Sequence, residues 1–186
     1  MKHTAITHRF AAAGRHQRGA SLLEIIAFLG IAAMVIIGAV SMINVSFTSA
    51  QGARLMEEAL GIRTGVKKLY MTQSTGYGTA VINDVLRDAK VLPATISVSA
   101  GVAAAAEIKN NFGGATTITG ATGQFTIEYT LVPQDTCVSA LSGVSGWSAI
   151  SVKGSAEVAF TTFPITNKDA IAKCDAATNT ITFTSL

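Results

Sequence analysis

The feature that most constrains the fold is an apolar run close to the N-terminus, LLEIIAFLGIAAMVIIGAV from Leu22 to Val40. Nineteen residues in an α-helix span about 28 Å, which is close to the thickness of the hydrocarbon core of a bilayer. Glu24 is the only charged residue in the run, and no proline interrupts it. The sequence therefore predicts a membrane-spanning helix that carries one acid near its start.

The charge of the chain is divided unevenly along its length. The formal net charge is +3, but four of the 14 basic residues, all three histidines and none of the 11 acidic residues lie in residues 1–19. Basic residues before the apolar run favour a cytoplasmic N-terminus. The part of the chain after Gly19 is slightly acidic, so no nucleic-acid-binding site is predicted in it.

An amphipathic pattern continues the helix beyond the apolar run. Apolar residues recur at steps of four, three, four and three, as on one face of a helix, at Leu55, Ala59, Ile62, Val66 and Leu69. The charged residues between them, Glu58 and Arg63 included, are expected on the wetter faces. Three glycines are expected to weaken this part of the helix, at Gly52, Gly61 and Gly65. We expect a helix from about Ser21 to Met71, ended by the turn residues at 75–78.

The rest of the chain predicts a smaller α+β body. A second helix is expected over about Ala80–Lys90, with Val81, Val85 and Leu86 on one side. Residues 94–124 are rich in Gly, Ala, Ser and Thr and are expected to form a loop with one or two short strands. The remaining expected elements are a strand at 124–131, a short helix from Cys137, and strands at 147–152 and 180–184. The predicted fold class is α+β, with the outer half of the long helix packed on a small antiparallel sheet.

The two cysteines, Cys137 and Cys174, lie far from the apolar run. An even cysteine count in an exported chain favours one disulfide, worth roughly 4 kcal/mol for a loop of this size in the chain-entropy model. A zinc site would need further ligands, and the chain has no histidine after residue 16. No metal site and no cofactor are predicted.

The start of the apolar run carries the most specific motif, Arg18-Gly19-Ala20-Ser21-Leu22-Leu23-Glu24. It resembles the class III signal sequence of type IV prepilins, in which a basic leader ends in glycine and a glutamate lies just inside the hydrophobic helix. The resemblance implies that a prepilin peptidase cuts between Gly19 and Ala20. It also implies that the new amine of Ala20 is methylated and that Glu24 takes part in assembly.

The resemblance divides the chain into a leader, residues 1–19, a long helix, residues 20–72, and a globular head, residues 73–186. Residues 20–45 would anchor the precursor in the membrane and later form the filament core. The cysteines would bound a region, 137–174, that pilin families expose on the filament. A 19-residue leader is longer than is usual for type IVa pilins, and the body is similar to the type IVb bundle-forming and conjugative thin-pilus pilins.

The function implied is the major subunit of a type IVb-like pilus for adhesion, aggregation or conjugative cell contact. The implied partners are copies of the same chain in a helical filament, the prepilin peptidase and assembly machinery, and a host or recipient-cell surface. The precursor would lie in the inner membrane with its leader in the cytoplasm, and the assembled subunit in an extracellular pilus.

A charged carboxylate near a membrane core costs about 3 kcal/mol on insertion scales unless it finds a partner. In a filament of packed helices, the free amine of Ala20 in a neighbouring subunit would supply one. Glu24 would then help to set the axial register, because only the correct stagger satisfies both charges.

Three alternatives remain at this point. A secreted protein with an ordinary signal peptide would be cut after Ala50, so that amino-terminal sequencing would read Gln51 instead of Ala20. A membrane-tethered enzyme is disfavoured because the acids after residue 19 are scattered and no site constellation is visible, although a Ser/Lys pair stays open. A type II secretion pseudopilin or a minor pilin would carry the same leader motif.

Overall fold

The computed structural model describes residues 21–74, 76–99, 106–154 and 156–186, without the side chains of residues 44 and 45. The predicted leader, with Gly19 and Ala20, lies outside the described residues. The described chain forms two compact units that divide after Met42, and each is considered by itself. Helix α1, Leu22–Tyr70, runs through both.

Helix α1 matches the predicted long helix to within a residue at each end. In the first unit, it is the one helix of the described chain that is long and apolar enough to cross a membrane, with a mean hydropathy of 2.6 in its most apolar window. By contrast, residues 43–70 belong to the second unit, the head, where the predicted apolar stripe is buried: Leu55, Ala59, Ile62 and Val66 are at most 2% exposed.

The head is built on one antiparallel sheet of seven strands in the order β1-β2-β3-β4-β7-β5-β6. The strands are β1 (Ser97–Ser99), β2 (Glu107–Lys109), β3 (Ala115–Ala121), β4 (Gln124–Pro133), β5 (Ala149–Lys153), β6 (Glu157–Phe160) and β7 (Thr178–Ser185). Three short helices complete it, α2 (Asn83–Asp88), α3 (Gln134–Ser142) and α4 (Asn167–Lys173). The predicted α+β class is correct.

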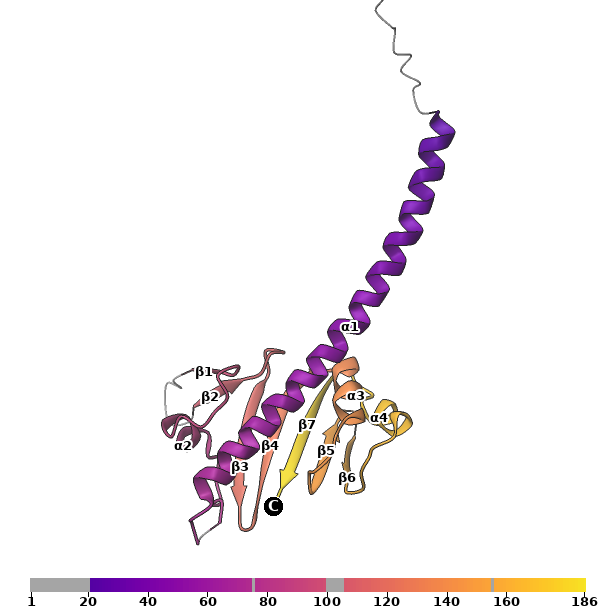
Figure 1. Cartoon of the computed structure of the whole chain (residues 1–186). Coiled ribbons are helices and arrows are strands. Elements are labelled where there is room, and N and C mark those ends of the chain that lie inside the picture. The colour runs from indigo at the N-terminus through magenta and orange to yellow at the C-terminus, as the bar shows by residue number, and fades with distance from the viewer. Residues whose placement is uncertain (1–20, 75, 100–105, 155) are drawn as a thin grey trace, which may run out of the picture. The chain divides into compact units, whose positions relative to one another are not determined.

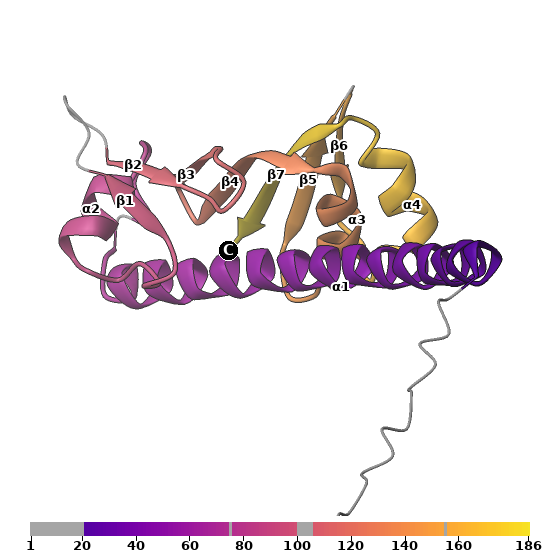
Figure 2. The same cartoon turned by 90° about the horizontal axis from the view of Figure 1, so that it is seen from above.

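The core of the head lies between the sheet and residues 43–70 of α1. Strands β4 and β7 alternate buried and partly exposed residues, so that Phe125, Ile127 and Tyr129 point to the same face as Ile181 and Phe183. Seen from above, this part of α1 lies along one face of the sheet (Figure 2). Helix α2 lies beside β1–β3 and helices α3 and α4 beside β5–β7 (Figure 1).

Two expectations for the middle of the chain were wrong. Residues 94–124 contain three strands, β1 to β3, instead of one or two. In the second helix, Val81 and Val85 do not share the buried side with Leu86, because they are 49% and 46% exposed while Ile82 is buried in their place. Ile82 and Leu86 are four residues apart, so they lie on the same side of the segment, and this is the side that packs on the core.

Candidate assembly surface

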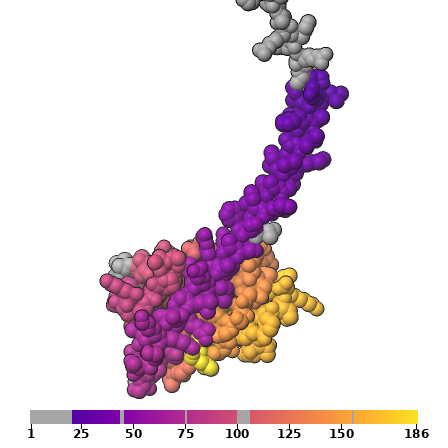
Figure 3. Space-filling view, viewed as in Figure 1, coloured from indigo at the N-terminus to yellow at the C-terminus, as the bar shows by residue number. Residues whose placement is uncertain are grey.

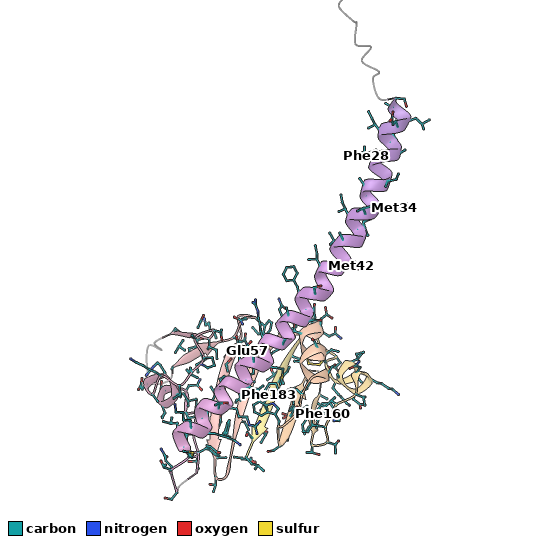
Figure 4. All side chains as sticks on the ribbon, viewed as in Figure 1. Phe28, Met34, Met42, Glu57, Phe160 and Phe183 are labelled. Atoms are coloured by element: carbon teal, nitrogen blue, oxygen red, sulfur yellow. A yellow bond between two sulfur atoms is a disulfide. The ribbon has the colours of Figure 1, made fainter. Side chains whose placement is uncertain are left out.

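The first candidate surface is the N-terminal part of α1, an apolar rod. Fifteen large apolar side chains between Leu22 and Phe47 are 48% to 78% exposed in the single chain. Phe28, Met34 and Met42 stand out from the helix in the side-chain view (Figure 4). A surface of this extent cannot face water, so it must be covered by lipid or by other protein.

The start of α1 is capped by its own sequence. Ser21 precedes the first helical residue, its hydroxyl oxygen accepts a hydrogen bond from the backbone N–H of Glu24 at 3.3 Å, and its carbonyl oxygen accepts from the same N–H at 2.9 Å. The spacing Ser-x-x-Glu is that of a capping box. Glu24 therefore lies in the first turn, where its negative charge also interacts favourably with the helix dipole.

The glycines in the second part of α1 allow close contact with the head, which sequence reasoning missed. A Cβ atom at Gly52 would lie 2.6 Å from the hydroxyl of Ser139 on α3. At Gly61 it would lie 2.7 Å from the ring of Pro93, and at Gly65 it would lie 2.5 Å from a backbone oxygen. These glycines lower the helix propensity of α1, but they let α1 pack closely against the rest of the head, which no other residue would permit.

Glu58 is not on a wetter face, as the charge pattern suggested, but 5% exposed. Its Oε1 accepts a hydrogen bond of 2.7 Å from Nδ2 of Asn111. Burial raises the pKa of Glu58, the hydrogen bond from Asn111 lowers it in part, and the nearby charge of Glu57 raises it further. The step of three from Leu55 to Glu58 was the available signal, because it places Glu58 on the apolar stripe.

Arg63 was also expected on a wetter face, but it is half-buried against the head. Its guanidinium carbon lies 5.0 Å from the centre of the Trp147 ring, a cation–π contact, and its Nε donates a 3.0 Å hydrogen bond to the hydroxyl of Ser185. Trp147 in turn packs on Phe183, with ring centres 4.9 Å apart. Arg63 therefore ties α1 to the end of β7.

A disulfide joins Cys137 on α3 to Cys174 at the end of α4, with the Cα atoms 6.0 Å apart. Both cysteines are fully buried. The bridge closes the region 137–174, which contains β5 and β6 as well as the two helices. The disulfide therefore links α3 covalently to the end of α4, beside one edge of the sheet. The cysteine count led us to expect one disulfide.

The described residues do not bring together the ligands that a metal site needs. Within them, no three His, Cys, Asp or Glu side chains are grouped closely enough to hold a metal ion. The cleft beside Glu58 is lined by Arg54, Glu57, Thr95 and Asn111. It contains two acids and one arginine, and the hydrogen bond to Asn111 gives Glu58 a structural role in the head.

The family model described as "PilS N terminal" matches residues 49–186, which is most of the chain. The chain belongs to the PilS family of type IV pilins. The match covers the head and the second part of α1, the parts that the leader motif did not identify. The comparison with curated proteins found no match.

Two solved structures have the same fold. One is a type IV b pilin from Salmonella typhi, 27% identical, with a TM-score of 0.57 over 69% of this chain and 95% of that one. The other is TcpA, a type IV pilin from Vibrio cholerae El Tor, 15% identical, with a TM-score of 0.53 over 74% and 99%. Together with the family match, they support a type IVb-like pilin, and these relatives are pilins, not enzymes.

Proposed function

We propose that this pilin is the major structural subunit of a type IVb-like pilus, cut after Gly19, methylated on Ala20 and assembled into a filament through its apolar rod. The observation that carries the proposal is the continuity of α1. One unbroken helix joins fifteen exposed apolar side chains to a stripe buried in the head. A signal peptide cut after Ala50 would divide that helix only five residues before the first buried member of the stripe, Leu55.

The energetics of the rod favour a subunit that never passes through water. Covering fifteen such side chains is worth on the order of 20–45 kcal/mol relative to water. Lipid and neighbouring helices both provide that cover, so the hydrophobic effect alone does not select the filament over the membrane. The preference for the filament over the membrane must come from packing between helices, from polar pairs and from the assembly machinery.

Glu24 is the residue that would make the filament more favourable than the membrane. In lipid, the capping arrangement with Ser21 gives its backbone a partner but leaves a charged carboxylate at the start of the apolar run. In a filament, the amine of Ala20 on a neighbouring subunit would pair with that carboxylate. The pair would favour the filament and fix the stagger between subunits.

The test is the variant Glu24→Ala, with Glu57→Ala as the matched control, because Glu57 is an exposed glutamate on the same helix. We expect both precursors to be processed, and we expect Glu24→Ala to yield few or no sheared filaments while Glu57→Ala yields a normal amount. Normal filament yield from Glu24→Ala would contradict the assembly role. Abundance of the wild-type chain in those filaments separates a major pilin from a minor pilin or pseudopilin.

The remaining parts of the proposal follow from the same filament. The precursor would sit in the inner membrane, where the prepilin peptidase and assembly machinery act on it, and the assembled pilus would be extracellular. The disulfide-bounded region 137–174 would face outward, where it would meet other filaments or a host or recipient cell. Limited proteolysis of intact filaments tests this, since cleavage confined to residues 73–136 would contradict it.

A further inference from the structure

A groove of about 720 Å³ opens beside the last turns of α1. Its lining includes Leu60 and Met71, which are 44% and 80% exposed, and Tyr77. Three basic side chains also line it, Arg63, Lys67 and Lys68. Among the described residues neither lysine has an ion-pair partner. We call this surface the basic groove.

A second exposed surface has the complementary chemistry. On the segment 81–88, Val81 and Val85 are 49% and 46% exposed and lie with two aspartates, Asp84 and Asp88. Arg87 pairs with both aspartates, at 3.3 Å and 2.9 Å, so one base faces two acids and the surface keeps a net negative charge. We call Val81, Asp84, Val85 and Asp88 the α2 knob.

These two surfaces account for much of the apolar exposure of the head. Beyond residue 48, eight large apolar side chains are exposed in the described part of the chain. Two of them line the basic groove and two belong to the α2 knob, while the other four lie on four different segments. Apolar side chains gathered beside charged groups are typical of a contact surface.

The groove and the knob lie on opposite flanks of α1. On one flank, Gly61 and Gly65 contact Pro93 and Val91, in the connection that follows α2. On the other flank, Arg63 in the groove reaches Trp147 and the end of β7. Figure 1 shows α2 with β1–β3 on one side of the helix and β5–β7 on the other, and Figure 3 shows that this part of α1 stays at the surface between them.

We propose that the basic groove receives the α2 knob of a second copy of this chain. Because the two surfaces are different and lie on opposite flanks, one contact leaves a free groove and a free knob for the next copy. Such a head-to-tail contact repeats without closing and generates a filament. This inference rests on the proposed pilus function, and it specifies which surfaces of neighbouring heads meet.

The contact is complementary in two ways. Val81 and Val85 of one copy cover Leu60 and Met71 of the next, which removes apolar surface of both from water. Asp84 and Asp88 lie against Lys67 and Lys68, which have no ion-pair partner among the described residues. Charge pairs at the rim of a contact mainly set partner choice and register, so the lysines and aspartates orient the subunits.

Cross-linking tests the contact directly. Filaments of Val85→Cys/Met71→Cys should give a ladder of dimers, trimers and higher species after mild oxidation, because each junction brings one new cysteine of each kind together. The matched control is Ile171→Cys/Met71→Cys, since Ile171 is 59% exposed on α4 but outside the knob. Filaments without a ladder from the first variant, or with an equal ladder from the control, would overturn the proposal.

Charge reversal provides a second test. Lys67→Glu/Lys68→Glu and, separately, Asp88→Lys should each lower the yield of sheared filaments by about tenfold or more, because an attraction becomes a repulsion at every junction. Combining the three changes should restore the yield. Lys153→Glu/Lys168→Glu is the control with the same change of charge on exposed positions outside the groove, and it should leave the yield unchanged. Normal yield from the first variants would overturn the proposal.

The proposed pilus function and the proposed contact between heads would be contradicted by different results. A wild-type chain that forms no filament at all would overturn the proposed function. Wild-type filaments that neither cross-link through Val85 and Met71 nor respond to charge reversal would overturn this contact alone. Subunit level and disulfide content in each variant exclude misfolding as the cause.

Discussion

The close contact at Gly65 leads to the most specific prediction about stability, for the variant Gly65→Ala. Gly65 is buried in α1, and an added Cβ would lie 2.5 Å from the carbonyl oxygen of Val91 and 3.3 Å from its Cβ. Ordinary contacts of a Cβ begin at 3.4 Å. The obstacle is backbone, and it is held in place because the N–H of Val91 donates to the carbonyl of Leu86 at 3.2 Å.

The magnitude follows from two opposing effects. Forcing an extra methyl group into a packed interface costs about 1–3 kcal/mol. Replacing glycine by alanine inside a helix returns about 1 kcal/mol of helix propensity. We therefore expect a net loss of up to about 2 kcal/mol in the free energy of unfolding, which for a domain of this size lowers Tm by about 2–8 °C.

Thermal unfolding of the full chain in detergent, followed by circular dichroism, measures this. Gly143→Ala is the matched control, because Gly143 follows α3 with a φ of −103° and nothing lies within 4 Å of its added Cβ. That control should melt at or slightly above the wild-type temperature. A Gly65→Ala variant as stable as the control would refute the reasoning that the glycine is required by close approach.

Three further predictions concern the head. Cys174→Ser should lower the free energy of unfolding by about 4 kcal/mol by releasing a loop of 37 residues, and subunit levels in an oxidising compartment should fall with it; unchanged levels would argue against a structural bridge. Glu58→Gln keeps an acceptor for Asn111. Because the pKa of Glu58 is raised in the folded head, its contribution to stability is full below the ordinary pKa of 4.5 and is lost as the pH rises through the folded value. Melting curves from pH 4 to 8 should therefore show this loss in the wild-type chain and not in Glu58→Gln. Identical pH profiles for the two proteins would contradict a buried charge at Glu58. Tyr129→Phe should be neutral or stabilising by up to about 1 kcal/mol, because the buried hydroxyl has no hydrogen-bond partner among the described residues and its pKa is raised by burial; a clear loss of stability in denaturant titration would reveal a missed partner.

The parts of the fold that the sequence predicted are those with a long, regular pattern. The apolar run and the stripe from Leu55 to Val66 repeat the helical period over many turns, and α1 ends within a residue of the predicted position. The alternation from Gln124 to Leu131 likewise gave β4, which extends two residues further to Pro133. In the stripe and in β4 the apolar residues that repeat in the sequence are also the ones that are buried in the fold, so the sequence pattern predicts the burial.

The missed elements are short or depend on distant contacts. Strand β3 is rich in threonine, yet Thr116 and Ile118 face the core because β4 pairs beside them. Helix α4 has seven residues, and its signal was the capping pattern at Thr166, whose hydroxyl accepts from the N–H of Asp169 at 3.2 Å. Strand β6 is partly exposed throughout and has no buried face to give it a period.

The N-terminal part of the candidate site could be proposed from the sequence, and the surfaces of the head could not. The motif around Gly19 and Glu24 can be read directly from the sequence, whereas the basic groove and the α2 knob depend on which side chains of α1 and of the segment 81–88 stay exposed when the head packs. Val85 shows the difficulty. The pattern placed its side chain on the same side as Leu86, but the core contact of Ile82 turns it outward.

The central claim is that the apolar rod remains part of the mature subunit and forms the filament core. Intact-mass spectrometry of subunits from sheared filaments tests it most directly. We expect one chain that begins at Ala20, carries one methyl group and contains the disulfide. A product that begins at Gln51, soluble and without the rod, would contradict it.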